Sequence, residues 1–600
     1  MSILSVLKER FRDALANLVD DPTPLLELIH PSQETKFGDY QADMAMSLGK
    51  RLRRPPREVA AEIIGWLDVA DICPRPEIAG PGFINLRIRD DSLVEWLSAA
   101  VPDARLGLPL IDQPRTFVVD YSAPNVAKPM HVGHIRSTVI GDALCRVLRF
   151  LGHRAISDNH IGDRGTQFGM ILYGYKHFLD TEAYQQHPVE ELARLYKLVR
   201  RLMDHQRAKE PSAAEPADPE VAQLSAQHPN INEAVLTETA KLHAGDSENR
   251  QLWQDFLPYC EDEIERVYRR LGVTFDHSLG ESFYQDRLSP IVDDLLQRDI
   301  ARESEGAVCV FLDGHKTPMI VRKKDGAFLY GTTDLATIRY RMETWRPDAI
   351  LYVVDHRQSL HFKQLFAAAR LLGYGDVELE HVSFGTVLGD DGRPFKTRSG
   401  DTVGLEGLLD EAVRRAAEIV SAGDDAKPDG PELSAQQRLQ IAESVGIAAL
   451  KYADLSQNRS SDYVFSYDKM LAMAGNTATY MQYAYARVRS IFARGNVDVE
   501  ALRVSGSPIL LNSPAERALA LELLQFSEAL DQTVADYRPN QLTSYLFDLA
   551  NRYSTFFEQC HVLRAESDEL RQSRLLLCDL TARTIQKGLE LLGIEVVEKM

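Results

Sequence analysis

Two histidines three positions apart, His131 and His134, enclose Gly133 in the sequence His-Val-Gly-His. Imidazole N–H groups can donate hydrogen bonds to phosphate oxygens, and such bonds count most when charge builds up during attack on phosphorus. A glycine between them would let a purine base pack directly on the backbone. The same spacing is also compatible with a pair of metal ligands or with polar residues at the start of a helix, so the surrounding elements must decide.

The elements around this motif are predicted to be a strand, a turn and a helix. An apolar run from Phe117 to Tyr121 predicts a strand, and the loop after it carries Pro124 and Pro129. Apolar residues recur near helical spacing from Ile135, and Gly152 stands where such a helix would stop. Because unpaired N–H groups and the helix dipole attract phosphates at a helix start, the pattern favours a nucleotide site at the sheet edge.

Composition narrows the class of protein. The chain has 600 residues, which predicts roughly three or more domains. Its six cysteines form no CxxC pair, so we expect a reducing, cytoplasmic location with no disulfide framework and no structural metal. Without a signal peptide or an apolar run of about twenty residues, no membrane contact is expected. The formal net charge of −20, taken alone, argues against binding of nucleic acid, although local clusters of Lys and Arg matter more than the sum. We expect a monomer.

The order of predicted elements divides the chain into parts. Residues 1–110 predict a small α+β domain, in which the alternating residues Phe83–Ile88 predict an edge strand. Residues 111–420 alternate strands with helices, which predicts an α/β fold with a doubly wound, Rossmann-like parallel sheet. A helical insertion at about 170–270 interrupts this alternation, and nothing in it resembles a β-rich editing module.

The C-terminal part is predicted to be all-α. A linker over residues 421–434 leads to residues 435–600, where five consecutive amphipathic helices predict a bundle. Two basic clusters, at residues 50–57 and 480–494, are each either a solvated face or a contact surface for an RNA backbone. Aromatic side chains beside arginines can stack on unpaired bases. The candidate RNA-contacting residues are Arg51, Arg53, Arg54, Tyr483, Arg487 and Arg489. Weaker candidates are the exposed end of the last helix and Tyr537, which is alternatively a core residue.

The stretch SAPNVAKPMHVGHIRST, followed by DNHIGDRGTQFG, resembles the catalytic signature of class I aminoacyl-tRNA synthetases, and within them the arginyl-tRNA synthetases. The likeness extends in order over nearly the whole chain, through KFGDYQ, GPGFINL, GESFY, LYGTTDLAT, LYVVDHRQSLHF and PFKTRSGDTV. It implies that L-arginine and ATP, with Mg²⁺ carried on the ATP, give arginyl-adenylate and pyrophosphate. The arginyl group then moves to the 3′ end of tRNA(Arg), whose elbow and anticodon would contact the N-terminal and C-terminal domains.

The resemblance also implies roles for individual residues. The positions that match ATP-binding residues are Pro124, His131, Gly133, His134 and Lys396. The positions that match arginine-binding residues are Ala123, Asn125, His134, Tyr330, Asp334 and Gln358. A carboxylate such as Asp334 can accept two parallel hydrogen bonds from a guanidinium, and lysine in that site would be disfavoured on the order of 10²-fold. Alternatively, Asp334 is a helix N-cap within TTDLAT.

One segment departs from the class I pattern. Where many members have a KMSKS loop, this chain has FKTRSG over residues 395–400, so one lysine of the pair is lost. Members with such a loop tend to carry a lysine just before the HxGH element, and Lys128 stands there. A flexible ammonium can offset charge on the leaving pyrophosphate, although Lys128 is alternatively an exposed loop lysine. The predicted catalytic residues are Lys128, His131, His134, Lys396 and Arg398.

Two other functions fit parts of the sequence. A nucleotidyl-transfer enzyme that uses HxGH without tRNA would have no use for the long helical C-terminal half. A catalytically silent, synthetase-like regulator would not need intact His131, His134, Lys128 and Asp334. The sequence therefore favours the arginyl-tRNA synthetase reaction.

Overall fold

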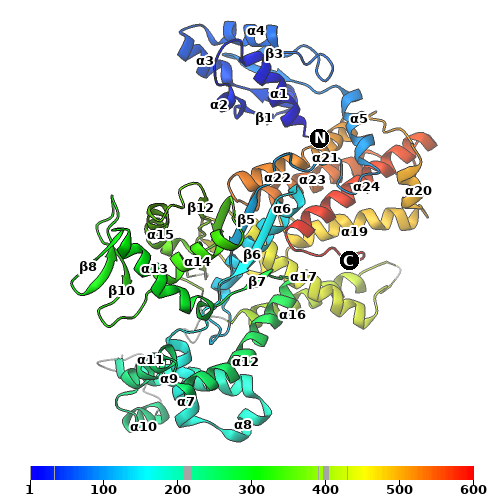
Figure 1. The fold of residues 1–600 in the computed structure, drawn as a ribbon. Helices are drawn as coiled ribbons and strands as arrows, with labels where there is room; N and C mark the ends of the chain where they lie inside the picture. The colour runs from blue at the N-terminus through cyan, green and yellow to red at the C-terminus, as the bar shows by residue number, and fades with distance from the viewer. Residues whose placement is uncertain (1, 33, 208–218, 390, 396–403, 429) are drawn as a thin grey trace.

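Residues 2–86 fold into a unit at one end of the molecule, and the helix over residues 90–100 that follows lies against the C-terminal helices (Figure 1). The computed structural model describes residues 2–32, 34–207, 219–389, 391–395, 404–428 and 430–600. A four-stranded antiparallel sheet with the order β1-β2-β4-β3 packs here against helices. The elements are α1 (Ile3–Leu15), α2 (Thr23–Leu26), β1 (Ile29–Pro31), η1 (Thr35–Phe37), β2 (Tyr40–Ala42), α3 (Met44–Leu52), α4 (Pro56–Trp66), β3 (Glu77–Ala79), β4 (Phe83–Leu86) and α5 (Asp90–Ala100).

Strand β4 is not the edge strand that the sequence predicts. It lies between β2 and β3, and Ile84, Asn85 and Leu86 are all buried. Residue alternation describes the two faces of a strand but not the number of its neighbours. The buried amide of Asn85 is satisfied because its Oδ1 accepts a hydrogen bond from Gln41 Nε2 at 2.8 Å.

A five-stranded parallel sheet with the order β12-β11-β5-β6-β7 lies at the centre of the chain. The order reverses at β5, because β6 and β11 pair with its two sides, and α6 crosses from β5 to β6. The predicted doubly wound parallel sheet is therefore confirmed, and its reversal point is where such sheets bind ligands. The elements are β5 (Thr116–Asp120), α6 (Val132–Leu151), β6 (Arg154–Asn159), β7 (His277–Ser278), η2 (Glu281–Tyr284), α13 (Gln285–Gln297), α14 (Tyr330–Thr344), β11 (Ala349–Tyr352), η3 (His356–Gln358), α15 (Ser359–Leu371) and β12 (Glu378–His381).

Two excursions interrupt this sheet. Between β6 and β7 the described residues are helical, as predicted, in α7 (Thr166–Phe178), α8 (Thr181–Gln186), α9 (Pro188–Arg207), α10 (Pro219–Gln227), α11 (Ile231–Ala244) and α12 (Ser247–Leu271). Between α13 and α14 an antiparallel sheet was not predicted, because its strands are too short to show a period of two. Its strands are β8 (Ala301–Ser304), β9 (Ala307–Val310) and β10 (Met319–Arg322).

The C-terminal part is helical, as predicted. Helix α16 runs to Asp425, so the linker predicted from Ser421 begins inside a helix. The third of the five predicted helices is divided into α21 and α22 at Gln525. Among the described residues, no helix combines the length and the apolar character needed to cross a membrane. The elements are β13 (Val387–Leu388), α16 (Leu405–Asp425), α17 (Ala435–Leu455), β14 (Tyr463–Val464), α18 (Tyr467–Met470), α19 (Ala478–Arg494), α20 (Val499–Val504), α21 (Pro514–Leu524), α22 (Phe526–Ala535), α23 (Asn540–Gln559) and α24 (Asp568–Leu591).

Buried polar contacts dock the N-terminal unit on α21 and α22. The guanidinium of Arg517 donates to Asp39 Oδ1 at 2.8 Å and to Asp39 Oδ2 at 2.7 Å. On α22, Glu528 Oε1 accepts hydrogen bonds from Tyr40 Oη at 2.7 Å and from the backbone N–H of Leu4 at 3.0 Å. The other oxygen, Glu528 Oε2, is buried and has no hydrogen-bond partner among the described residues.

Replacing this carboxyl should stabilise the protein at alkaline pH. Burial raises the pKa of Glu528 to about 7 from 4.5, so the folded state keeps a proton that the unfolded state releases. Stability therefore falls as the pH rises from 4.5 to 7. For Glu528→Gln we expect a gain in the free energy of unfolding that is near zero at pH 4 and grows to about 3 kcal/mol at pH 8, measured as a rise in melting temperature. Glu9→Gln, an exposed change on α1, is the control and should show no such pH dependence.

Candidate functional site

The loop that follows β5 is held in an unusual conformation. Ser122 and Ala123 have φ values of 71° and 45°, a left-handed backbone that costs about 1–3 kcal/mol in residues other than glycine. The Ser122 N–H donates to Ser137 Oγ at 2.8 Å, and the Ala123 N–H donates to Asn159 Oδ1 at 3.1 Å. These bonds to α6 and β6 fix the turn, which leaves Ala123 exposed at the carboxyl edge of the sheet.

The next part of the loop pairs with the chain that follows β6. The Gly162 N–H donates to the Pro124 carbonyl, and the Val126 N–H donates to the Gly162 carbonyl, both at 2.9 Å. Asn125 lies exposed between these two bonds, while Pro124 is buried. Ala123 and Asn125 are therefore exposed on a loop whose backbone is bonded to the segment that follows β6.

The two histidines begin helix α6, and their hydrogen bonds fix which ring nitrogen carries the proton. His131 is the N-cap, and its Nδ1 accepts from the Gly133 N–H at 3.1 Å. His134 Nδ1 accepts from the His131 N–H at 3.0 Å, and the two ring centroids lie 4.0 Å apart. A nitrogen that accepts cannot carry the proton, so each neutral ring carries it on Nε2.

Electrostatics keep both rings neutral. Burial, followed by the charge of His131, lowers the pKa of His134 to about 3. Burial, followed by the charges of Lys128 and Arg357, lowers the pKa of His131. Gly133 between them is exposed, and a Cβ there would lie 2.9 Å from His131 Cε1. At neutral pH the start of α6 therefore offers two Nε2–H donors, from His131 and His134, beside the exposed backbone of Gly133.

Lys128 lies close to this pair but faces the helical insertion. Its side chain is half-buried, in a narrow crevice with Ile171 of α7, Leu192 of α9 and Tyr259 of α12. Burial, followed by the charge of Arg200, lowers the pKa of Lys128. Lys128 is therefore not the exposed loop lysine of the alternative interpretation.

Asp334 and Tyr330 lie in the first turns of α14. The N-cap of α14 is Leu329, so the alternative interpretation of Asp334 as a helix cap is wrong. Asp334 Oδ2 lies 2.6 Å from Nε2 of His361 on α15. Burial would lower the pKa of His361, but the bond and charge of Asp334 raise it. Tyr330 is 71 % exposed and begins the same helix.

Glu281, in the GESFY segment, is a third polar residue near Tyr330 and Asp334. No role for it was predicted from the sequence. Its N–H donates to the Ile161 carbonyl at 3.1 Å, which places η2 beside the end of β6. Partial burial, followed by the carboxylates of Glu281 and Asp334, raises the pKa of Tyr330. Burial also raises the pKa of Glu281, and the nearby charge of Asp334 adds to this effect. Two carboxylates beside a phenol suit a ligand with a delocalised positive charge.

Gln358 stands at the same sheet edge, after β11. It is exposed and ends η3, whose N-cap Asp355 accepts from the Arg357 N–H at 2.8 Å. Lys396 and Arg398 lie outside the described residues. The Phe395 N–H, which precedes them, donates to the Val387 carbonyl at 3.0 Å.

A buried ion cluster beneath the site was not predicted. Arg341 of α14 donates to Asp120 of β5 at 2.6 Å and to Asp158 of β6 at 2.7 Å, and its side chain is 0 % exposed. Burial raises the pKa of Asp120, and the charge of Arg341 opposes this shift. The cluster ties the helix that carries Tyr330 and Asp334 to the two central strands.

Removing the arginine should unfold the central sheet readily. Arg341→Met leaves two buried carboxylates unpaired, which typically costs about 3–5 kcal/mol. We expect the melting temperature of the sheet's transition to fall by roughly 10 °C at pH 8, and by less at pH 5, where unpaired carboxyls can protonate. Arg339→Met is the matched control on the same helix, because Arg339 pairs with Asp294 in a partly exposed position.

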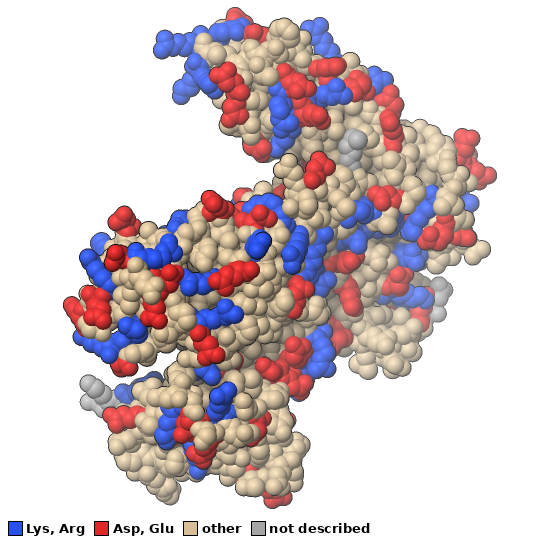
Figure 2. Space-filling model, viewed as in Figure 1, with Lys and Arg blue, Asp and Glu red and all other residues tan. Residues whose placement is uncertain are grey.

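The predicted RNA-contacting residues lie on two surfaces. Arg51, Arg53 and Arg54 are exposed at the junction of α3 and α4, where basic side chains gather at the outer end of the N-terminal unit (Figure 2). On α19, Tyr483, Arg487 and Arg489 line a groove of about 850 Å³, and the Arg487 guanidinium lies 4.0 Å from the Phe557 ring centroid.

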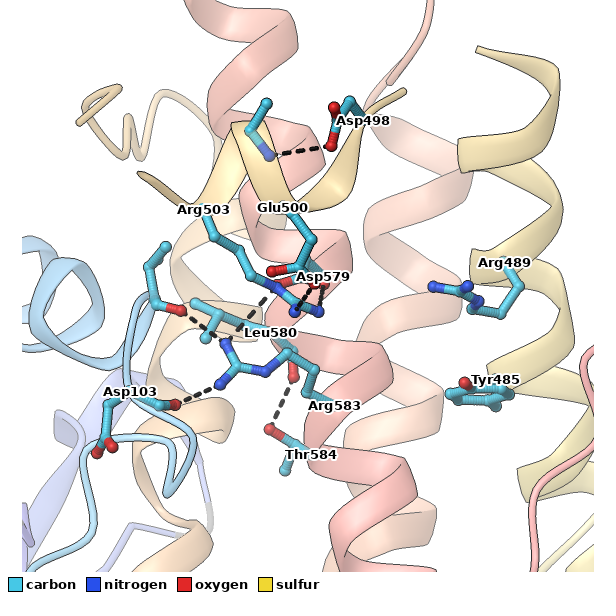
Figure 3. Close-up of polar contacts among 12 residues, drawn as sticks. Asp103, Tyr485, Arg489, Asp498, Glu500, Arg503, Asp579, Leu580, Arg583 and Thr584 are labelled. Carbon is cyan, nitrogen blue, oxygen red and sulfur yellow. Dashed lines mark hydrogen bonds and ion pairs between the residues drawn. The ribbon is translucent and has the colours of Figure 1, made fainter. Parts of the chain in front are cut away.

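Other polar residues of the C-terminal part are engaged internally. Tyr485 of α19 points toward α24 (Figure 3), where Arg503 pairs with Asp579 at 2.7 Å and Arg583 donates to the Val101 carbonyl at 2.7 Å. Tyr537 is buried and donates to Glu378 at 2.8 Å, so its interpretation as an RNA contact is wrong. Within the described residues, no group of three or more His, Cys, Asp or Glu could hold a metal ion.

Comparison with known proteins shows the family to which the chain belongs. Residues 98–467 match the catalytic domain of class I tRNA synthetases (R), residues 481–600 the DALR anticodon binding domain, and residues 5–88 the arginyl tRNA synthetase N terminal domain. Arginine–tRNA ligases of Rhodopirellula baltica and Cellvibrio japonicus are 46 % and 45 % identical, with full coverage of both chains in each comparison. The arginyl-tRNA synthetase structure from Plasmodium falciparum has a TM-score of 0.79 and 27 % identity, covering 100 % of this chain and 99 % of that one. The chain therefore belongs to the arginyl-tRNA synthetases of class I.

Proposed function

We propose that this chain is an arginine–tRNA ligase that activates L-arginine with ATP and transfers it to tRNA(Arg). The observation that carries the proposal is the convergence of Asp334 and Glu281 on Tyr330, at the sheet edge where His131 and His134 present their Nε2–H groups. A planar cation and a phosphate chain would each meet groups of the right sign there.

In the first step, a carboxylate oxygen of arginine attacks the α-phosphorus of ATP, which is bound with its Mg²⁺. The bond from that phosphorus to the bridging oxygen breaks, and pyrophosphate leaves. His131 and His134 donate to the α-phosphate oxygens as charge grows on them, with the adenosine against Gly133 and Pro124. Lys128, Lys396 and Arg398 offset the charge of the leaving pyrophosphate.

In the second step, a ribose hydroxyl of the terminal adenosine attacks the carbonyl carbon of arginyl-adenylate, and AMP leaves. Arginine is selected by its guanidinium, which donates hydrogen bonds to the carboxylates of Asp334 and Glu281. Tyr330 and Gln358 would contact the same group. Ala123, Asn125 and His134 would hold the amino and carboxylate groups of arginine.

Transfer RNA contacts are proposed on two surfaces. Arg51, Arg53 and Arg54 would meet the RNA backbone near the elbow, and the α19 groove of Tyr483, Arg487 and Arg489 would meet unpaired anticodon bases. We further propose that the protein acts as a monomer in the cytoplasm.

The test is arginine-dependent exchange of pyrophosphate into ATP, run with and without tRNA(Arg). We expect exchange with arginine, and exchange slower on the order of 10²-fold with lysine at equal concentration. Folded protein that supports no exchange under either condition would exclude the proposal. Exchange that appears only with tRNA would show that the adenylation site needs RNA to reach its reactive geometry.

A further inference from the structure

The last eight residues form a strap, Gly593–Met600, that runs along α17 and α19. The Gly593 carbonyl accepts from Lys451 Nζ of α17 at 2.6 Å, and the Glu595 carbonyl accepts from Gln482 Nε2 of α19 at 2.7 Å. Further on, the Glu598 carboxylate accepts from Tyr485 Oη at 2.9 Å and from Arg489 Nε at 2.8 Å. One end of the strap is therefore held in the interior and the other on the candidate RNA face.

Lys451 is the buried end of this connection. Its side chain is 1 % exposed, and its ammonium donates to the carbonyls of Leu271 and Gly593, each at 2.6 Å, with Asp142 Oδ2 of α6 at 4.0 Å. The two carbonyls lie at or just beyond the C-terminal ends of α12 and α24, where the helix dipoles favour a cation. Burial lowers the pKa of Lys451 to about 8, so the ammonium form prevails at pH 7.

The strap packs directly on the charges of α6. Gly593 has φ of +68°, and a Cβ there would lie 2.6 Å from Asp142 Oδ2 and 2.7 Å from Lys451 Nζ. Asp142 also accepts from Arg146 Nε at 2.8 Å, and Arg146 donates to the Gly272 carbonyl at 2.7 Å. A movement of Gly593 must therefore disturb the Asp142–Lys451 contact.

The same face of α17 contacts the helix start that carries the histidines. Asp454, three residues after Lys451, pairs with Arg136 Nε at 3.2 Å, and both side chains are no more than 1 % exposed. Arg136 lies two residues after His134. Lys451 and Asp454 thus contact α6 at Asp142 and Arg136, which lie about a turn and a half apart. Arg136 is beside the proposed nucleotide site.

The ion pair at the outer end of the strap is weak. Arg489 and Glu598 have side chains 36 % and 62 % exposed, and ion pairs of this kind are worth about 0–1 kcal/mol. An arginine guanidinium pairs with a phosphate through the same N–H groups that it uses for a carboxylate, so an RNA phosphate can displace Glu598 from Arg489. At the inner end, a cavity of about 630 Å³ beside Arg146, Lys451 and Gly593 leaves room for the strap to shift.

We infer that Lys451 is a positioning residue that couples the α19 face to the histidine-bearing helix through the strap Gly593–Met600. The inference rests on the proposed function, in which α19 contacts tRNA. With no RNA bound, Glu598 pairs with Arg489. When an RNA phosphate pairs with Arg489 instead, the outer end of the strap is released and Gly593 moves. As a result, α6 shifts relative to α17 at the Asp142–Lys451 contact.

The test is a double-mutant cycle of Glu598→Gln and Lys451→Met, read by pyrophosphate exchange as a function of tRNA(Arg) concentration. In the otherwise unchanged protein, Glu598→Gln should raise exchange without tRNA about fivefold and lower the tRNA concentration for half-maximal exchange. In the Lys451→Met background, Glu598→Gln should change exchange without tRNA by less than about 1.5-fold. An equal effect of Glu598→Gln in both backgrounds, or no effect in either, would overturn the inference.

A second measurement does not depend on the folding of Lys451→Met. Hydrogen exchange of the α6 amides should change when tRNA(Arg) binds, and Glu598→Gln should produce the same change without tRNA. An α6 that does not respond to either overturns the inference. Glu569→Gln, which removes an exposed charge in the first turn of α24, is the matched control and should leave both readouts unchanged.

Direct binding of tRNA(Arg) separates this inference from the proposed function. If Arg487→Ala and Arg489→Ala both leave the Kd for tRNA unchanged, the proposed RNA face is wrong, and the inference fails with it. If they weaken binding while Glu598→Gln leaves exchange and α6 unchanged, the RNA face stands and only the coupling fails.

Discussion

Asp334→Asn should raise the KM for arginine on the order of 10²-fold while the KM for ATP changes less than about threefold. The amide keeps the shape of the side chain and can still accept from His361, which lies 2.6 Å from Asp334 Oδ2. It loses the negative charge and one of the two acceptors that a guanidinium fork requires. Pyrophosphate exchange with tRNA(Arg) present, at varied arginine and ATP, measures both constants.

The control is Asp325→Asn, an exposed carboxylate whose Oδ1 accepts from the Ala327 N–H at 3.0 Å in the turn before α14. It should leave both constants unchanged. Equal rises in the KM for arginine and for ATP in Asp334→Asn would contradict direct contact with arginine. They would mean instead that Asp334 acts through His361 and the packing of α14 on α15.

Lys128→Ala should lower the rate of arginine activation on the order of 10²–10³-fold, with the KM for arginine within about threefold of its original value. An ammonium that meets the leaving pyrophosphate acts only as charge develops there, so its loss reduces kcat and not substrate binding. The reverse reaction, from arginyl-adenylate and pyrophosphate, passes through the same transition state, so its kcat/KM for pyrophosphate should fall by a similar factor. Single-turnover measurements in both directions provide the comparison.

Two further variants separate charge from packing. Lys128→Arg keeps the positive charge and should recover at least part of the rate, whereas Lys324→Ala, a change of an exposed lysine, should be neutral. Lys128 also lines the crevice against α7, α9 and α12. If Lys128→Arg is as slow as Lys128→Ala, the side chain serves to seat the insertion and the leaving-group role is wrong.

The features that local sequence predicts well are those that a few neighbouring residues determine. The strand, proline loop and helix around the HVGH motif follow from apolar spacing over residues 116–151, and the structure confirms β5 and α6 there. The predicted helical insertion and the C-terminal bundle also depend on local periodicity, and both are confirmed in the described residues. The tautomers of His131 and His134 do not follow from sequence, because they depend on which backbone N–H each ring accepts.

Long-range partnerships escaped sequence reasoning. Asp120 ends the apolar strand β5, which signals a buried charge, and Asp158 lies near the end of β6, but neither position identifies Arg341 as the partner. Glu281 lies 53 residues before Asp334 in the sequence, and the two approach only because η2 and α14 pack at the same sheet edge. Strand β4 was placed at an edge because alternation cannot count neighbours.

The pairing of β5 with β11 has a consequence for synthesis of the chain. These two strands form the middle of the parallel sheet, yet β11 follows β5 by roughly 230 residues. At about 5–20 residues per second, a ribosome needs on the order of 10–50 s to deliver β11 after β5 has emerged. During that interval one side of β5 is an unpaired apolar edge, the kind of surface on which nascent chains aggregate. We therefore expect this sheet to be the stretch where a holding chaperone is needed during translation.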